Sequence, residues 1–372
     1  MACKEAERVP FLVFNHVEDL VIERRDNVGV LTLNRPKVLN AMTLPMLEQI
    51  GRSLTAWRDD PDVQAVMVRG NGRSFCAGGD IVALRRAALA GNSDENDRLY
   101  RTEYSLNALI ATYTKPYVAL AHGYCMGGGL GLLMHGSHRV VAPDTLLAMP
   151  ETAIGFFPDV GASYVFARLK HGLGMYLGLT GSRMSAGAAI RAGLATHYID
   201  DISIGALVEA IVDGPSLESA LSRYASTPPT DLEDDRAAIE RCFDTESIGE
   251  IVTRLEGEHT TWASATLDRL RAASPTSLVL TFAMIRNARS LDLLAALRVE
   301  YVLAKHMWRR PEFLDGIRAV VIDKDRSPCW QPARSRDVDL AAIDLLLAEA
   351  AQEASAGGDP IERVSAMMFY TR

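Results

Sequence analysis

Cysteine is scarce in this chain, and a long apolar run is missing. The five cysteines among 372 residues are odd in number, lie far apart and form no Cys-x-x-Cys pair. This pattern argues against a disulfide framework and against a zinc site, and it is typical of a reducing compartment. No stretch approaches the ~18 consecutive apolar residues of a membrane-spanning helix. We therefore expect neither a bound metal nor a membrane partner.

Positive charge is also in short supply. Lys and Arg number 39 against 47 Asp and Glu, which gives a formal net charge of −8. Nucleic acids bind basic surfaces, so nucleic acid is not an expected partner. The N-terminal segment MACKEAERVPFLVF has too short an apolar run for a signal peptide and too little Arg and Ser for a transit peptide. We expect a cytoplasmic protein, with the mitochondrial matrix as the alternative in a eukaryote.

Strand-like and helical segments alternate in the first half of the chain. Residues 20–33 predict a hairpin with Asp26 and Asn27 in the turn, and residues 43–58 predict a helix capped by Thr43. Further apolar strands are expected at 63–70, 117–123 and 138–143. This alternation predicts an α/β domain with a largely parallel sheet over residues 15–200.

The second half has fewer strand signals. We expect a mainly helical region over 201–354 and a tail over 355–372. A helix with apolar residues on one face is predicted to begin at Ser290 and to continue to about Trp308. The apolar segment 317–324 is interpreted as either a strand or buried coil.

Two glycine-rich turns follow two of the predicted strands. Residues 74–80 read SFCAGGD, and residues 123–131 read GYCMGGGLG. Glycine lets a ligand approach the backbone closely, and free N–H groups at a helix start point at such a ligand. Two turns side by side would aim two N–H groups at one oxygen, which is the oxyanion hole that acyl transfer needs. Packing of helix against strand is the alternative explanation of these glycines.

Several other chemistries lose support. Neither turn ends in the Gly-Lys-Ser/Thr of a phosphate-binding loop, and the chain has no Gly-x-Ser-x-Gly elbow of a serine hydrolase. Cys76 and Cys125 lie in the turns, but no histidine is placed by the sequence to activate either thiol. His122 and His138 are interpreted as structural.

Two carboxylates lie eight residues apart in the apolar segment MPETAIGFFPDVG, as Glu151 and Asp159. A buried carboxyl group has a raised pKa and becomes suited to proton transfer or nucleophilic attack near neutral pH. A helix-start charge at Glu151 and a turn residue at Asp159 are the alternatives.

Three motifs point to a family. The segments LNRPKVLNAM (33–42), FCAGGDI (75–81) and HGYCMGGGLGL (122–132) resemble the signatures of the enoyl-CoA hydratase/isomerase superfamily. The 149–161 segment, together with SPTSL, LRVEY and GIRAVVIDKDRSPCW further on, resembles its 3-hydroxyisobutyryl-CoA hydrolase branch. The likeness covers most of residues 18–335 and fades over 225–260. It implies the ClpP/crotonase-like α/β fold of ββα units, followed by a mainly helical C-terminal part.

The resemblance also implies roles for individual residues. Gly79 and Gly128 would form the oxyanion hole, Glu151 and Asp159 would be the catalytic pair, and Glu103 would contact the substrate. The remaining residues implied to line the acyl-coenzyme A site are Lys37, Val38, Leu39, Gly78, Asp80 and Gly127. Basic candidates for the coenzyme A phosphates are Lys37, Arg73, Arg85 and Arg86.

One position favours hydrolysis over hydration. Hydratases of the superfamily carry a second catalytic Glu two residues after the triple glycine, where this chain has Gly131. The resemblance thus implies a thioesterase that hydrolyses 3-hydroxyisobutyryl-CoA in valine catabolism, with no cofactor beyond the coenzyme A of its substrate. A hydratase or isomerase, a non-catalytic acyl-CoA-binding protein and a hydrolase of another acyl group remain alternatives. Homo-oligomers are common in the superfamily and are possible here.

Overall fold

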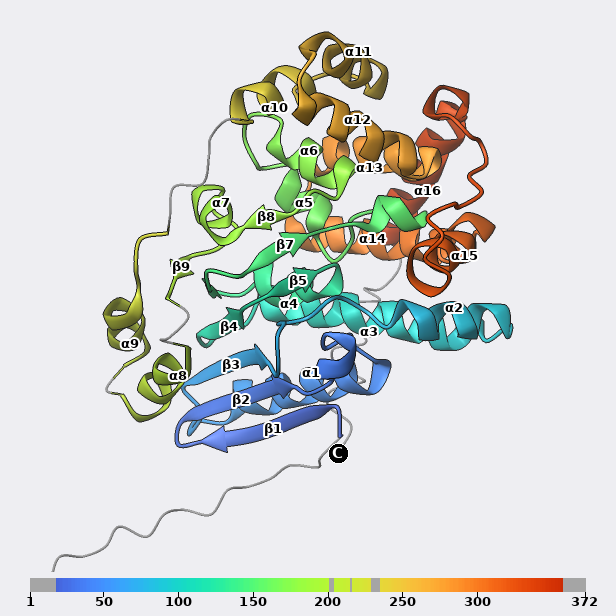
Figure 1. Cartoon of the computed structure of the whole chain (residues 1–372). Helices are drawn as coiled ribbons and strands as arrows, with labels where there is room; N and C mark the ends of the chain where they lie inside the picture. The colour runs from blue at the N-terminus through green and yellow to red at the C-terminus, as the bar shows by residue number, and fades with distance from the viewer. Residues whose placement is uncertain (1–17, 201–203, 215, 229–234, 357–372) are drawn as a thin grey trace, which may run out of the picture.

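A six-stranded sheet forms the frame of the protein (Figure 1). The computed structural model describes residues 18–200, 204–214, 216–228 and 235–356. The strands, in spatial order, are β1 (Leu20–Arg25), β2 (Val28–Leu33), β3 (Ala65–Gly70), β4 (Tyr117–Ala121), β6 (His138–Val141) and β9 (His197–Tyr198). The β1–β2 pair is antiparallel and every other pair is parallel. The predicted hairpin and parallel sheet are confirmed.

A second, smaller sheet lies beside the first. It consists of β5 (Tyr124–Met126), β7 (Leu146–Ala148) and β8 (Met184–Ser185). The helices that accompany the two sheets are α1 (Leu44–Asp59), α2 (Ile81–Leu89), α3 (Ser93–Ala111), α4 (Gly128–Met134), α5 (Ala162–Phe166), α6 (Leu173–Thr180) and α7 (Ala186–Arg191). Thr43 caps α1 as predicted, because its side chain accepts a hydrogen bond from the N–H of Met46.

The C-terminal part is helical, as the sequence predicts. Its helices are α8 (Ile204–Asp213), α9 (Leu217–Tyr224), α10 (Arg236–Phe243), α11 (Ile248–Glu258), α12 (Thr261–Ala272), α13 (Pro275–Asn287), α14 (Leu293–Met307), α15 (Pro311–Ile317) and α16 (Leu340–Ala356). Short helical turns are η1 (Pro36–Val38), η2 (Glu151–Ile154), η4 (Ala288–Ser290), η5 (Arg318–Ile322) and η6 (Ser335–Asp337).

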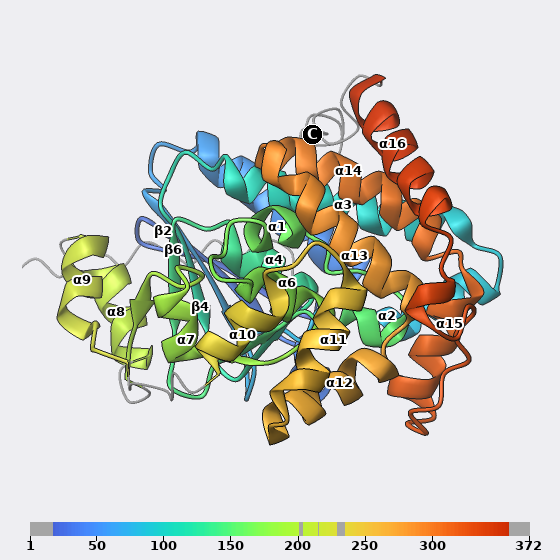
Figure 2. The ribbon, with the colours of Figure 1, turned by 90° about the horizontal axis from the view of Figure 1, so that it is seen from above.

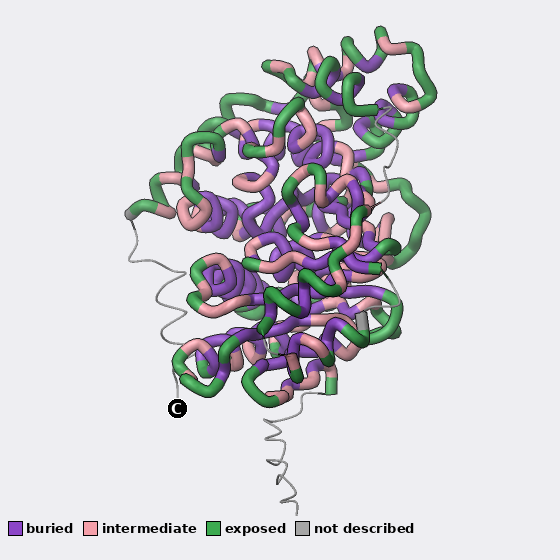
Figure 3. The backbone as a smooth tube through the Cα atoms, turned by 90° about the vertical axis from the view of Figure 1, so that its left-hand side faces the viewer, coloured by how far each residue is buried: buried purple, intermediate pink, exposed green. Residues whose placement is uncertain are grey.

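The large sheet buries both of its faces. Alternate residues of β2 point to opposite sides, so Leu31 and Leu33 join one apolar cluster, and Val28 and Val30 join another. The first cluster runs through α1 and α3 and on into the C-terminal helices as far as α16. The second is closed by α8 and α9, which lie on the far side of the sheet from α15 and α16 (Figures 1 and 2). Buried residues accordingly fill the middle of the molecule, and exposed residues lie at its periphery (Figure 3).

Two local predictions are wrong. The predicted helix does not begin at Ser290, because Asp292 is the cap of α14 and accepts from the N–H of Ala295 at 2.8 Å. Segment 317–324 is neither strand nor coil: α15 continues directly into the π-helical turn η5. Arg318 holds this turn by pairing with acidic residues on both sides of it, among them Asp315 at 2.6 Å.

The capping of α14 gives a first prediction. Asp292→Ala should lower the free energy of unfolding by about 1 kcal/mol, because one helix-start N–H loses its acceptor. Ser290→Ala is the matched control, since the Ser290 hydroxyl only donates to the Asn287 carbonyl. Denaturant unfolding of both variants measures the difference, and equal losses would contradict the assignment of the cap.

Candidate active site

The two glycine-rich turns lie against each other. Cys76 and Cys125 form a parallel β-bridge, in which the Cys76 N–H donates to the Tyr124 carbonyl at 3.1 Å and the Met126 N–H donates to the Cys76 carbonyl at 2.9 Å. Segments almost fifty residues apart in sequence are thereby fixed side by side. The sequence predicts the two turns, and this bridge brings them together.

The backbone at Gly78 and Gly79 is held from the other side by Met42. The Met42 N–H donates to the Gly78 carbonyl, and the Asp80 N–H donates to the Met42 carbonyl, both at 2.8 Å. This pairing does not use the N–H of Gly79, which has no acceptor among the residues that the structure describes. Gly78 has φ of +106°, and a Cβ on it would lie 3.5 Å from the nitrogen of Gly128, so the two turns meet here.

Gly128 is the first residue of α4, where an N–H has no acceptor within the helix. Gly127, before it, has φ of +51°, which favours glycine. The N–H groups of Gly79 and Gly128 therefore both lie at the contact between the turns, and neither belongs to a regular backbone ladder. Two unused donors at one place are what an oxyanion needs.

Three buried carboxyl groups surround this contact. Glu103 from α3 is 4% exposed, Glu151 at the start of η2 is 8% exposed, and Asp159 before α5 is 6% exposed. A Cβ on Gly127 would lie 2.7 Å from Glu151 Oε1, and a Cβ on Gly128 would collide with Glu103 Oε1. Glu103 and Glu151 thus face the glycine turns directly.

The shared burial raises the pKa values of all three groups. Burial raises the pKa of Glu103 to about 7. Burial, and then the charge of Glu103, raise the pKa of Glu151 to about 8. The pKa of Asp159 is raised well above its ordinary range by burial and by the charges of Glu103 and Glu151. One oxygen each of Glu103 and Glu151 has no hydrogen-bond partner among the described residues, which leaves both available to a ligand.

Gly131 has no room for a side chain. A Cβ there would lie 2.6 Å from the amide nitrogen of Asn107 and 3.0 Å from the Cβ of Val160. The position where hydratases of the superfamily carry a Glu is filled by these two neighbours. The site therefore has the Glu151 and Asp159 carboxyl groups without the additional one.

The cysteines and histidines near the turns have structural surroundings. Burial raises the pKa of the Cys76 thiol to about 12 and that of Cys125 well above its ordinary value, so both stay protonated at neutral pH. His122 Nε2 lies 2.9 Å from the Gly72 carbonyl, and His138 Nδ1 lies 2.9 Å from the Ser137 hydroxyl. The burial of the two thiols and the hydrogen bonds of the two histidines explain all four residues, and no catalytic role is needed for them.

The predicted coenzyme A loop borders the first glycine turn. Leu39 accepts a hydrogen bond from the Ala77 N–H at 2.9 Å, while Lys37 and Val38 are exposed. The Asp80 carboxylate is already engaged, because it caps α2 and pairs with Arg35 at 3.1 Å. Among the basic candidates for the phosphates, Arg73 and Arg86 are exposed, whereas the Arg85 Nε donates to the Leu314 carbonyl at 2.8 Å.

Tyr100 is a neighbour of the site that the sequence analysis missed. Its ring stacks on Phe156 with centroids 5.7 Å apart. Its pKa is raised by burial and then by the charges of Asp159, Glu103 and Glu151. It lies three residues before Glu103 on α3, and this helical spacing was the signal available in the sequence.

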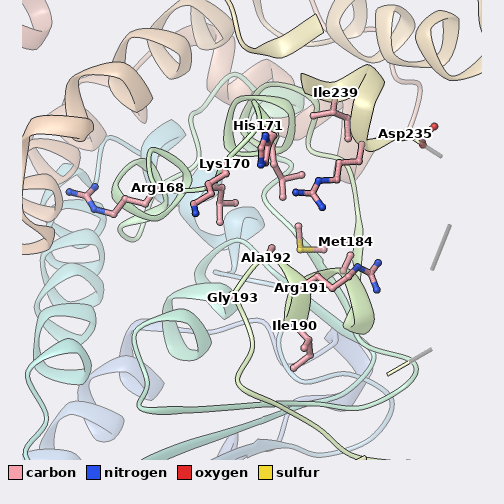
Figure 4. A pocket seen from close by; sticks show the side chains of 14 residues that line it. Arg168, Lys170, His171, Met184, Ile190, Arg191, Ala192, Gly193, Asp235 and Ile239 are labelled. Carbon is pink, nitrogen blue, oxygen red and sulfur yellow. The ribbon is translucent and has the colours of Figure 1, made fainter. Parts of the chain in front are cut away.

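A cavity of about 510 Å³ lies elsewhere, between the α5–α6 loop, α7 and α10 (Figure 4). Lys170, His171 and Arg191 are among its lining residues, and none of the three carboxyl groups is. Cavity volume alone therefore does not locate the site that the glycine turns define.

Among the described residues, no helix is long and apolar enough to cross a membrane, and no group of His, Cys, Asp and Glu is arranged to hold a metal ion.

Comparison with known proteins identifies the family. A model of the enoyl-CoA hydratase/isomerase family matches residues 28–347. The chain belongs to this family. It is 40% identical over 338 residues to the mitochondrial 3-hydroxyisobutyryl-CoA hydrolase of Danio rerio, covering 88% of each chain. It is 40% identical over 333 residues to the human enzyme of the same name, covering 86% of each. It is 37% identical over 342 residues to 3-hydroxyisobutyryl-CoA hydrolase 1 of Arabidopsis thaliana, covering 87% of this chain and 90% of the relative.

Solved structures of the family confirm the predicted crotonase-type fold with its helical C-terminal part. A protein described as a carnitinyl-CoA dehydratase from Mycobacterium thermoresistibile superposes with a TM-score of 0.84 at 35% identity, covering 89% of this chain and 96% of that one. One described as an enoyl-CoA hydratase from Rhodobacter sphaeroides 2.4.1 gives 0.82 at 37% identity, covering 89% and 97%.

The glycine turns give a second prediction. Gly128→Ala keeps the N–H but drives a methyl group into Glu103, so Glu103 or the start of α4 must shift, and kcat should fall by about a hundredfold, the effect of a small misplacement at the site. Gly79→Ala is the matched control, because nothing lies within 4 Å of its added Cβ. It should keep the wild-type melting temperature and raise KM, since its methyl group enters open space in front of the turn. Steady-state kinetics and thermal melts compare the two; a normal kcat for Gly128→Ala would exclude the proposed geometry.

A third prediction concerns pH and stability. The pKa of Glu151 is about 8 in the folded chain against an ordinary 4.5, so between these values the folded state binds more protons than the unfolded state. Stability is therefore lost as pH rises through this window. Glu151→Gln removes the burial cost and should melt higher than wild type at pH 8, with a smaller difference at pH 5.

The control for this measurement is Glu48→Gln, which removes a carboxylate paired with Arg98 outside the site. The difference in melting temperature between Glu48→Gln and wild type should not become more favourable to the variant at pH 8 than at pH 5. A Glu151→Gln protein that is less stable than wild type at pH 8 would mean that the carboxylate stabilises the fold.

Proposed function

We propose that this protein hydrolyses 3-hydroxyisobutyryl-CoA, or a similarly short β-hydroxyacyl-CoA, to the free acid and coenzyme A. The observation that carries the proposal is the Glu151 carboxyl group, which is buried beside Gly127 and has one oxygen without a hydrogen-bond partner among the described residues. Relatives named as 3-hydroxyisobutyryl-CoA hydrolases, at about 40% identity over most of the chain, support the choice of reaction and substrate.

In this proposal the thioester oxygen sits between the two glycine turns. The N–H groups of Gly79 and Gly128 donate to it and stabilise the negative charge that develops when the carbonyl carbon is attacked. The open side of Gly79 provides the approach for the acyl group. The loop of Lys37, Val38 and Leu39 then lies beside the coenzyme A portion.

In this proposal the ionised form of Glu151, whose share grows as the pH approaches its pKa of about 8, starts the reaction by one of two routes. As a nucleophile it adds to the carbonyl carbon, coenzyme A leaves as a thiol after taking up a proton, and water cleaves the resulting anhydride. As a general base it takes a proton from a water molecule that attacks the same carbon. Either way one water is consumed and one thiol and one acid are produced. No cofactor beyond the coenzyme A of the substrate enters the reaction.

Asp159 and Glu103 complete the site in this proposal. The pKa of Glu103, about 7, keeps part of its population protonated near neutral pH, and a protonated carboxyl group can donate a hydrogen bond. Burial also raises the pKa of Asp159. Asp159 is assigned to the substrate hydroxyl or to the proton that reaches the leaving sulfur. Glu103 is assigned to contact with the acyl group beside Gly128.

Hydrolysis is preferred over hydration because of Gly131. Addition of water across a double bond in this superfamily uses two glutamates, and the second position is closed here by Asn107 and Val160. The names of the two solved relatives as a dehydratase and a hydratase keep hydration as the competing function. The mitochondrial names of the curated animal relatives support the mitochondrial matrix as the location if the source is a eukaryote.

The fourth prediction tests the reaction directly. Purified protein should release free thiol from 3-hydroxyisobutyryl-CoA and should leave the enoyl absorbance of crotonyl-CoA almost unchanged. Glu151→Gln should still bind acyl-CoA but lose about 10²- to 10⁴-fold in kcat, the usual contribution of a catalytic acid or base. Glu48→Gln, in α1, should keep the wild-type rate.

Two other results would point elsewhere. Fast loss of enoyl absorbance without thiol release would replace hydrolysis by hydration. No turnover with either substrate, combined with a melting temperature raised by acyl-CoA, would indicate a binding protein, because a ligand that binds only the folded state stabilises it.

A further inference from the structure

The turn that carries Asp159 has an unusual backbone. Val160 has φ of +52° and Gly161 has φ of +89°, so two consecutive residues adopt the left-handed region. A β-branched residue such as valine is rarely found there and is strained, which means that the surroundings must hold it. Gly161 must be glycine, because a Cβ would lie 2.7 Å from His135 Cε1.

Glu300 holds one side of this turn from α14. Its carboxylate is fully buried and accepts three hydrogen bonds: from the Gly161 N–H at 2.6 Å, from the Ser163 N–H at 3.0 Å and from the Ser163 hydroxyl at 2.5 Å. All three donors lie within four residues of Asp159. A buried carboxylate with three donors fixes the peptide planes that follow Asp159.

His135 holds the other side. Its Nε2 lies 2.6 Å from the Val160 carbonyl. Burial lowers the pKa of His135 to about 4, so the ring is neutral near pH 7 and donates its Nε2–H to this carbonyl. His135 directly follows α4, the helix that begins with Gly128. The same short helix thus carries an oxyanion donor at one end and a tie to the Asp159 turn at the other.

We propose that Glu300 is a positioning residue of the active site which, together with His135, clamps the 159–163 turn and fixes the Asp159 carboxyl group relative to Gly128. This inference rests on the proposed function, because it assumes that Asp159 takes part in turnover. The competing explanation is that Glu300 only fastens α14 to the core. A fastening role affects stability, whereas a positioning role affects kcat at constant substrate binding.

The charge of Glu300 also bears on Asp159, because it helps to raise the pKa of that carboxyl group. The other titratable groups that face Asp159 are Tyr100, Tyr104 and Glu103 on α3, and Glu151 on η2. All of them stay in place when only Glu300 is changed. Burial raises the pKa of Glu300 itself to about 7, so it is mostly charged above that pH, and loss of this charge should shift the pH profile of kcat toward lower pH in that range.

The test is Glu300→Gln, which keeps the shape but loses the charge and places an amide group against the N–H donors. We expect kcat to fall between about tenfold and a hundredfold, the effect of a small misplacement of a catalytic group, with KM nearly unchanged. Glu48→Gln is the matched control: it makes the same change at a carboxylate of α1 that pairs with Arg98 outside the site, and it should keep a kcat near wild type. An unchanged kcat and pH profile for Glu300→Gln would overturn the inference.

A double-mutant cycle separates this inference from the proposed function. If Glu300 acts through Asp159, Glu300→Gln should cost nothing further in an Asp159→Asn background, whereas independent losses would multiply and overturn the inference. Full turnover by Asp159→Asn alone would instead overturn the role of Asp159 in the proposed function.

If Glu300→Gln does not fold, the variant His135→Leu takes over the test, because it removes the donor to the Val160 carbonyl. An unchanged kcat in that variant would refute the clamp.

Discussion

The burial of three neighbouring carboxyl groups, Glu103, Glu151 and Asp159, is the constraint on which the site depends. Each charge is costly there, and each raises the cost of the next. Glu103 and Glu151, with pKa values of about 7 and about 8, therefore retain protons near neutral pH that a free carboxyl group would release. Such an arrangement cannot come from one segment. Glu103 is supplied by a long helix, Glu151 by a short helical turn, and Asp159 by a strained loop. The surrounding fold holds these elements together against their mutual repulsion.

The C-terminal helices provide much of that restraint. The Ser274 N–H, at the start of α13, donates to the Thr152 carbonyl beside Glu151 at 2.9 Å. α15 is pressed so closely on η2 that a Cβ on Gly155 would lie 2.9 Å from the Glu312 carbonyl. Together with the contact between Glu300 and the Asp159 loop, these bonds make the helical part the wall of the site. The division of the chain at residue 200 stays a prediction, although the main apolar cluster runs across it.

Sequence patterns predict those structural elements whose conformation depends on residues close together in the sequence. The hairpin, the Thr43 cap and the two glycine turns each depend on a few neighbouring residues. Two prediction errors have the same local origin: Ser290 and Asp292 are both good caps, and the apolar run after Ile317 suits a strand until the acidic partners of Arg318 are considered. Glu300 lay beyond prediction, because its donors are 137 to 139 residues away in sequence.

The glycines near the site differ in the space that the surrounding protein leaves for a side chain. Gly128 and Gly131 are required by the protein itself, since neighbouring side chains already occupy the space that a Cβ would need. Gly79 faces open space, so in the proposed reaction only the substrate would require it to be glycine. In a lineage that lost the enzymatic activity, selection on position 79 would therefore relax at once, while positions 128 and 131 would remain under selection for folding. Variation confined to position 79 would mark the relatives that no longer use a thioester.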